Sequence, residues 1–90
     1  MKTAKTQVIN ASGLHARPAS MFVKLAKGFE SEIQIRNLDK DGSFVNAKSI
    51  MRLLTAELCK NDWLELKAEG PDEAEAVDQL IALVNSGFGE

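Results

Sequence analysis

Residues 12–19 read Ser12-Gly13-Leu14-His15-Ala16-Arg17-Pro18-Ala19 and mark the change from an extended segment to a helix. Gly13 permits a tight turn with a positive φ angle. Pro18 suits the first turn of a helix, where the N–H that proline lacks would have no partner. The apolar spacing after Pro18 is helical and predicts a helix over residues 16–27, with Gly28 as its C-terminal cap.

His15, the single histidine of the chain, is predicted to lie at the N-terminus of this helix. A helix N-terminus offers unpaired N–H groups and the positive end of the dipole, and together they bind phosphate readily. The same field disfavours an imidazolium, and a neutral imidazole can accept a phosphoryl group covalently. The phosphate would lie against the N–H groups of Ala16 and Arg17, with the Arg17 guanidinium adding charge and hydrogen bonds. A lone histidine is more often a helix-end residue without chemistry, and it is the surrounding sequence that favours the phosphoryl site.

Composition and charge exclude several classes of protein. Ninety residues predict one domain, 1–90, with a small core. A net charge of −2 predicts no bulk attraction to nucleic acid or to an anionic membrane. The chain has no apolar run long enough to span a membrane and no hydrophobic signal core, so we expect a cytoplasmic protein. Cys59, the one cysteine, cannot form a metal site with one histidine, so we expect no metal and no cofactor, and a partly buried Cys59.

The remaining elements follow from periodicity and turn signals. Alternation of apolar and polar residues predicts four strands, at residues 3–9, 31–37, 44–45 and 63–69. A short apolar helix is expected to begin at Ser49, and a longer helix has Pro71 at its first helical position. The stripe expected to pack on the sheet consists of Ala74, Val77, Leu80, Ile81 and Val84. The order βαββαβα predicts an α+β fold, an open-faced β-sandwich whose four-stranded antiparallel sheet is covered on one face by three helices.

Three segments together resemble the HPr family, the histidine phosphocarriers of the bacterial phosphotransferase system. Gly13–Ala19 is similar to the phosphorylation-site signature of the family. A second match consists of residues 22–24, 26–29 and 31–33, and Ala47–Met51 is similar to the regulatory-serine segment of the family. The resemblance covers almost the whole chain. The loop at 37–42 is about three residues longer than in the common carriers, and the ending at 83–88 resembles the nitrogen-related branch, NPr.

The resemblance implies a function, a fold and partners. The family fold has four strands and three helices. Phosphorylated enzyme I would phosphorylate His15 on Nδ1, and His15 would pass the group to an EIIA-type domain, so that the chain is a monomeric carrier and not an enzyme with its own turnover. By the same resemblance, Ser49 is where an HPr kinase/phosphorylase would act in bacteria that have one.

A docking surface for these partners is expected around the second helix. Lys24 and Lys27 lie on the first helix, and Lys48 and Arg52 flank the second. If the two helices lie side by side, this basic ring surrounds an apolar patch of Ile50, Met51 and Leu54 and suits a transient acidic partner. For any single lysine, a solvated helix face is the commoner interpretation.

Two alternatives stay open. One is an NPr-like carrier with the same His15 chemistry that reports nitrogen or energy state and does not feed sugar uptake. The other is a regulatory interaction module in which phosphorylated Ser49 forms the recognised surface and His15 is incidental. The pairing of His15 with Arg17 argues against the second alternative.

Overall fold

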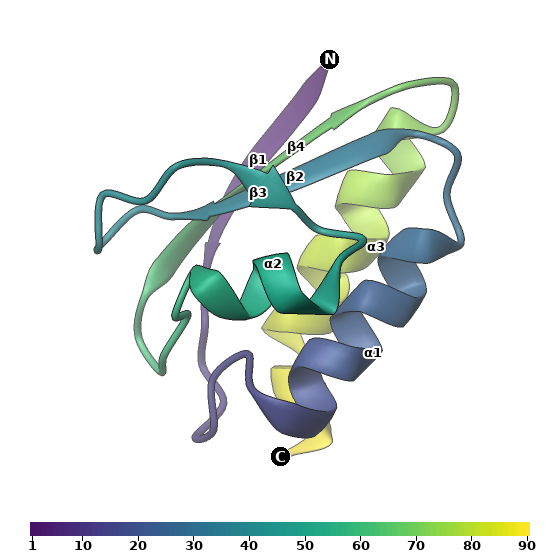
Figure 1. Ribbon diagram of the computed structural model, residues 1–90. Helices are drawn as coiled ribbons and strands as arrows, with labels where there is room; N and C mark the ends of the chain where they lie inside the picture. The colour runs from purple at the N-terminus through teal and green to yellow at the C-terminus, as the bar shows by residue number, and fades with distance from the viewer.

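The computed structural model describes all 90 residues and contains four strands, three α-helices and a short 3-10 helix (Figure 1). The strands form one antiparallel sheet in the order β1-β4-β2-β3. The helices all lie on one face of this sheet, which confirms the open-faced architecture predicted from the sequence (Figure 1). The elements are β1 (Lys2–Gln7), α1 (Ala16–Lys27), β2 (Glu32–Asn37), β3 (Val45–Asn46), α2 (Ile50–Thr55), β4 (Trp63–Glu69), α3 (Glu73–Asn85) and η1 (Gly87–Gly89).

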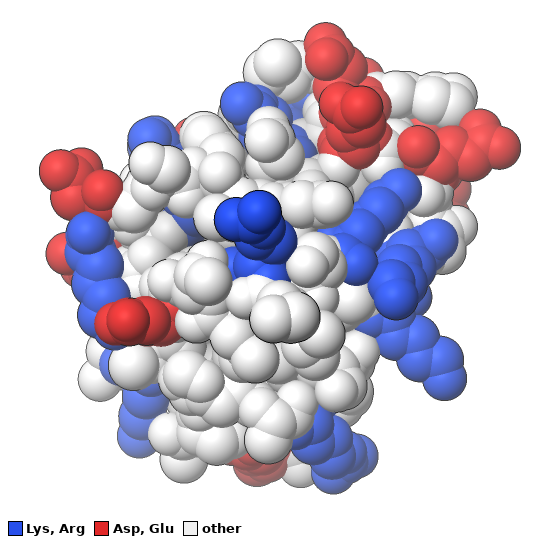
Figure 2. Space-filling view, in the orientation of Figure 1, with Lys and Arg blue, Asp and Glu red and all other residues white.

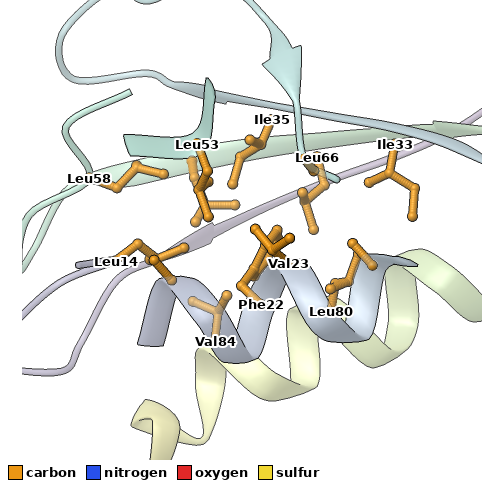
Figure 3. Close-up of a cluster of buried hydrophobic side chains, with 14 of the residues drawn as sticks. Leu14, Phe22, Val23, Ile33, Ile35, Leu53, Leu58, Leu66, Leu80 and Val84 are labelled. Atoms are coloured by element: carbon orange, nitrogen blue, oxygen red, sulfur yellow. The ribbon is translucent and has the colours of Figure 1, made fainter. Parts of the chain in front are cut away.

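The core lies between the sheet and the helices, as the alternation in β4 predicts. Leu64, Leu66 and Ala68 are fully buried, while Trp63 on the opposite face is 45% exposed. The apolar face of α1 packs against these side chains through Phe22 and its neighbours (Figure 3). Each fully buried large side chain of this kind stabilises the fold by roughly 1.5–3 kcal/mol. The opposite face of α1 is therefore exposed to solvent.

The two edge strands of the sheet, β1 and β3, differ slightly from their predicted limits. β1 ends at Gln7, two residues early, although the Val8 amide still donates to the Asp62 carbonyl at 2.9 Å. β3 covers Val45–Asn46, one residue later than expected. The Phe44 ring directly before β3 stacks under two cations of the uncovered face, Arg36 at 4.7 Å and Lys67 at 4.2 Å from the ring centroid, and only Val45 and Asn46 pair with β2.

α3 begins later than the proline signal predicted. Pro71 precedes the helix, Asp72 is its N-cap residue and Glu73 is its first residue. The Asp72 carboxylate does not cap the helix; it accepts hydrogen bonds from the Glu30 and Ser31 amides at 2.9 and 3.0 Å and so joins α3 to the entry of β2. The buried stripe accordingly starts at Ala76 and continues through Val77, Leu80 and Val84, while Ala74 is exposed and Ile81 is half-buried.

The longer loop at 37–42 is tied down by Asn37, whose side chain is buried. Its Nδ2 donates to the Ala56 carbonyl at 3.1 Å and to Asp62 at 3.0 Å, and its Oδ1 accepts from the Asp39 amide at 3.0 Å. Cys59 lies near this loop and is exposed, not partly buried as expected, because it belongs to the surface connection between α2 and β4, in which Leu58 is the side chain that packs inward. No helix combines the length and the apolar character needed to cross a membrane.

Candidate functional site

Gly13 fixes the loop that leads into α1. Its φ is +64°, as the sequence predicted, and a Cβ atom here would lie 2.4 Å from the Leu58 carbonyl oxygen. The close approach allows the Leu14 amide to donate to that same carbonyl at 2.8 Å. Only glycine meets both requirements, so the segment before His15 is held against the turn that follows α2.

His15 occupies the N-cap position of α1, with an extended backbone and an exposed side chain that makes no capping hydrogen bond. Ala16 and Arg17 are the first two residues of the helix, and their amides have no carbonyl one turn earlier to which they could donate. Both side chains are exposed as well. The structure therefore brings together the histidine, the two amides and the guanidinium-bearing residue that the sequence singled out.

The backbone of Ala16 is unusual, and no sequence pattern predicts its conformation. Its φ is +49°, a left-handed conformation that costs a residue with a Cβ atom roughly 1–2 kcal/mol. Strain of this kind persists only where the surrounding structure holds it in place. The flanking residues do so here, since Leu14 and Pro18 are both buried on either side of the His15–Arg17 segment.

Three residues of this region were not predicted. Asn10 is buried and donates through Nδ2 to the Gly13 carbonyl at 2.8 Å, which closes the turn before His15. The Ser12 amide donates to the Glu90 carboxylate at 3.2 Å, and the Ser12 hydroxyl donates to the same group. Asn10 and Ser12 belong to a turn-forming run visible in the sequence, but Glu90 is 78 residues from Ser12 and carries no local signal.

Ser49 is the N-cap residue of α2, as predicted. Its Oγ accepts a hydrogen bond from the Arg52 amide at 3.3 Å. Of the apolar residues of α2 only Leu53 is buried, while Met51 is 77% exposed and Ile50 and Leu54 are exposed to about half that degree. The apolar patch predicted from the sequence is therefore present at the surface of a short helix.

Of the basic residues expected around this patch, Lys24 and Lys27 are exposed, whereas Lys48 is not fully exposed. Lys24, Lys27 and Ile50 line one shallow hollow of about 260 Å³, so α1 and α2 do lie side by side there. Figure 2 shows lysine and arginine side chains gathered along the edge of the molecule where α1 runs, next to uncharged atoms. Lys48 differs, because it is half-buried and its ammonium donates to the Phe29 carbonyl at 2.7 Å.

This arrangement can hold a phosphoryl group on an exposed imidazole. The unpaired amides at the start of α1 and the nearby guanidinium are the donors that stabilise a phosphate. Among the 90 residues described, no three His, Cys, Asp or Glu side chains are grouped so as to hold a metal ion. Transfer at such a site depends on positioning and electrostatics.

Comparison with known proteins finds matches that cover almost the whole chain. The family model described as PTS HPr component phosphorylation site matches residues 2–86. The chain is 47% identical over 88 residues to the multiphosphoryl transfer protein of Vibrio cholerae, and this match covers 98% of the chain but 22% of that much longer protein. It is 40% identical to phosphocarrier protein NPr of Escherichia coli, covering 93% of the chain and 91% of NPr.

Solved structures agree with the fold. The crystal structure of HPr-C-His from Thermoanaerobacter tengcongensis superposes with a TM-score of 0.93 at 43% sequence identity, covering 100% of the chain and 98% of that protein. The similarity to an HPr and to an NPr is thus nearly equal.

Proposed function

The chain belongs to the HPr family of the phosphotransferase system, and from this premise we propose that it carries a phosphoryl group on His15. The proposal depends on one observation above all, the exposed His15 side chain at the N-cap position of α1, directly before two amides without intrahelical partners. A lone pair of the imidazole would attack the phosphorus, and the bond from phosphorus to the donor would break. In the second transfer, the next acceptor would attack the phosphorus, and the bond from phosphorus to His15 would break.

Arg17 would supply the charge for this transfer. Its guanidinium follows His15 by two residues on the exposed side of α1 and can offer parallel N–H donors to phosphoryl oxygens. Charge spreads over these oxygens in the transition state, so a fixed cation nearby lowers the barrier.

The donor and acceptors would dock on α1 and α2. Family membership implies partners of the phosphotransferase system, and we propose enzyme I as the donor and EIIA-type domains as acceptors. The exposed Met51, Ile50 and Leu54 side chains would make the apolar contact, and Lys24, Lys27 and Arg52 would face acidic residues of the partner. Lys48 would contribute less, since the Phe29 carbonyl already binds its ammonium.

The branch of the family decides which acceptor is used, and the near-equal similarity to HPr and NPr leaves both a sugar-type and a nitrogen-type EIIA as candidates. The experiment is transfer in two steps. Phosphoenolpyruvate and enzyme I first label the chain, and the labelled chain is then mixed with one EIIA or the other while intact mass is followed. The acceptor that discharges the chain faster by an order of magnitude or more identifies the branch.

The same experiment tests the carrier function itself. The wild-type chain is expected to gain one acid-labile phosphoryl group, and the His15→Gln variant is expected to gain none. A labelled His15→Gln variant would place the group elsewhere, and an unlabelled wild type beside a fully labelled reference carrier would contradict transfer from that enzyme I.

We also propose Ser49 as a regulatory phosphorylation site. Its half-exposed hydroxyl lies at the start of α2, next to the apolar patch. A phosphate here would add about −1.5 to −2 charges at a helix N-terminus, which is locally favourable. The same charge would repel an acidic partner from the patch.

A further inference from the structure

A shallow hollow lies between α1 and α3, which run side by side and antiparallel in the helical layer (Figure 1). The hollow has a volume of about 470 Å³ and is lined by Met21, Leu25 and Leu83, together with the exposed Lys24 and Gly28. Its three large apolar side chains are half-buried and pack against the core from outside. Lys24 also lines the hollow between α1 and α2, so this second apolar surface begins on the other side of that lysine.

The two helices that border this hollow carry opposite charges. Every charged side chain of α1 is basic, whereas every charged side chain of α3 is acidic. Arg17 and Lys24 are exposed on α1, and Glu75 and Asp78 are exposed on α3. None of these four side chains takes part in an ion pair within the chain, whose three ion pairs join other groups. An apolar centre is thus flanked by cations on one side and by carboxylates on the other.

We propose that this surface binds a second copy of the chain, with α1 of each copy lying against α3 of the other. A two-fold contact uses the same patch on both partners, so the patch must be complementary to itself. A half-turn about an axis along the hollow places each basic helix over an acidic helix and brings the two apolar centres together. Placing α1 against α1 would instead bring like charges into contact, which is unfavourable.

The contact is expected to be weak and reversible. The hollow is small, and exposed ion pairs each add little free energy. Complexes with small interfaces are transient, so we expect a dissociation constant between about 10 μM and about 1 mM. The chain is then a monomer at low concentration, as the family resemblance implies. Because Lys24 lines both hollows, a bound second copy would cover part of the surface proposed for docking of other proteins.

Sedimentation velocity and NMR test the contact directly. At low salt, the weight-average sedimentation coefficient should rise reversibly between about 10 μM and about 1 mM chain. The rise should shrink near 1 M salt, where charges are screened beyond about 3 Å. Over the same concentration series, the amide signals of Leu25 and Leu83 should shift, while that of Lys5 on the uncovered face of the sheet should not.

Charge-reversal variants locate the contact. Lys24→Glu is expected to weaken self-association about tenfold or more, because it places a carboxylate against Glu75 of the second copy twice in each dimer. Glu75→Lys should weaken it in the same way. The double variant Lys24→Glu/Glu75→Lys restores opposite charges, and its dissociation constant should return to within about threefold of wild type. Lys5→Glu makes the same charge change on an exposed residue of the sheet and is the matched control.

Three results would overturn the proposal. The first is a chain that stays monomeric near 1 mM at low salt, which would leave the hollow to a different partner. The second is a dimer that Lys24→Glu does not weaken, which would place the contact elsewhere on the molecule. The third is a double variant no better than either single one, since both charges would then act without facing each other. None of these results bears on the proposed carrier function, because no phosphoryl donor is present.

Discussion

Single residues shape the loop around His15, and two of them, Gly13 and Ala16, have the same left-handed backbone conformation for opposite reasons. Gly13 needs a positive φ because a Cβ atom would collide with the Leu58 carbonyl. Ala16, which follows His15, has a positive φ although it carries a Cβ atom, so its backbone is strained. The loop is therefore strained at one position and relaxed at the other.

The contrast between these two positions is measurable by substitution. Gly13→Ala is expected to lower the free energy of unfolding by about 2 kcal/mol or more, since it adds left-handed strain to a backbone clash. Ala16→Gly is expected to leave the free energy of unfolding unchanged or raise it by up to about 1 kcal/mol, because glycine adopts this φ without strain. Urea unfolding of both variants checks the pair, and a clear loss of stability in Ala16→Gly would contradict the left-handed backbone.

Arg17 carries the second prediction at this scale. Arg17→Glu is expected to slow transfer from enzyme I by two orders of magnitude or more, because it replaces the cation beside the transferring group with a like charge. Arg17→Lys should be slowed less, since an ammonium keeps the charge but loses the paired donors. Lys5 is exposed on the uncovered face of the sheet, and Lys5→Glu makes the same charge change, so it serves as the control when the transfer rate is measured. A folded Arg17→Glu variant with wild-type rates would exclude Arg17 from the transfer.

At the scale of elements, α2 has only six residues, and it combines an N-terminus capped by Ser49, one buried side chain and an exposed apolar patch. Leu53 packs into the core, Ser49 caps the N-terminus and Met51 stays in solvent. A helix this short has little stability of its own, so its cap and its one buried side chain matter more than in a long helix. The apolar patch therefore lies on a short helix that a single buried side chain, Leu53, anchors in the core.

Two substitutions of Ser49 distinguish its role as a helix cap from its proposed regulatory role. Ser49→Ala is expected to lower the free energy of unfolding by about 1 kcal/mol, the usual cost of losing a cap. Ser49→Asp can still cap and places an anion at the helix N-terminus, so its melting temperature should stay at or slightly above that of wild type. Its labelling by enzyme I should nevertheless weaken, mainly through a higher KM.

The control for the Ser49 experiment is Ser43→Asp, which adds the same charge to an exposed residue outside α2. If Ser49→Asp and Ser43→Asp are labelled with the same KM as wild type, Ser49 lies outside the contact surface and is an ordinary helix cap. If both weaken labelling equally, the effect is one of net charge and not of position.

Much of the element plan could be predicted from the sequence, and the misses have physical causes. The limits of α1 follow from Gly13, Pro18 and Gly28, which act locally. The proline signal predicts that α3 begins at Pro71, but proline is tolerated just before a helix as well as at its first position, so the signal does not fix the first residue. At the observed N-cap position, the Asp72 carboxylate binds the Glu30 and Ser31 amides just before β2, and this contact between residues 42 and 41 positions apart has no local signal in the sequence.

The candidate site was predictable in its chemistry but not in its surroundings. His15 and Arg17 stand in one short stretch, and the helix that follows them is strongly patterned, so their placement could be derived. The positive φ of Ala16 could not, because alanine has no preference for that conformation. The approach of Glu90 to Ser12 depends on the packing of α3 and Phe88, which no local pattern encodes.

For the whole molecule, acid is expected to loosen the fold at the seam between α3 and the sheet. Hydrogen bonds from the Ser31 hydroxyl and the Glu30 and Ser31 amides hold the pKa of Asp72 below its ordinary value. A lowered pKa in the folded state contributes stability above the unfolded value of about 3.9, and this contribution is lost as pH falls through the folded value. The free energy of unfolding should therefore fall as pH drops below about 4.

Urea unfolding between pH 7 and pH 2.5 checks this prediction. Asp72→Asn is expected to be less stable than wild type at pH 7 and to lose less stability on acidification. The exposed Asp78→Asn on α3 is the matched control and should follow the wild-type pH profile. Parallel profiles for Asp72→Asn and wild type would show that the seam does not contribute to acid sensitivity.

The central proposal is that the molecule carries its phosphoryl group on one atom, Nδ1 of the single histidine. The most direct measurement is phosphorus–nitrogen coupling by NMR on chain labelled with ¹⁵N-histidine and phosphorylated by enzyme I and phosphoenolpyruvate. The account predicts one phosphorus signal coupled directly to Nδ1 of His15, absent in His15→Gln. A phosphorus signal coupled to Nε2, or one that survives the loss of His15, would contradict it.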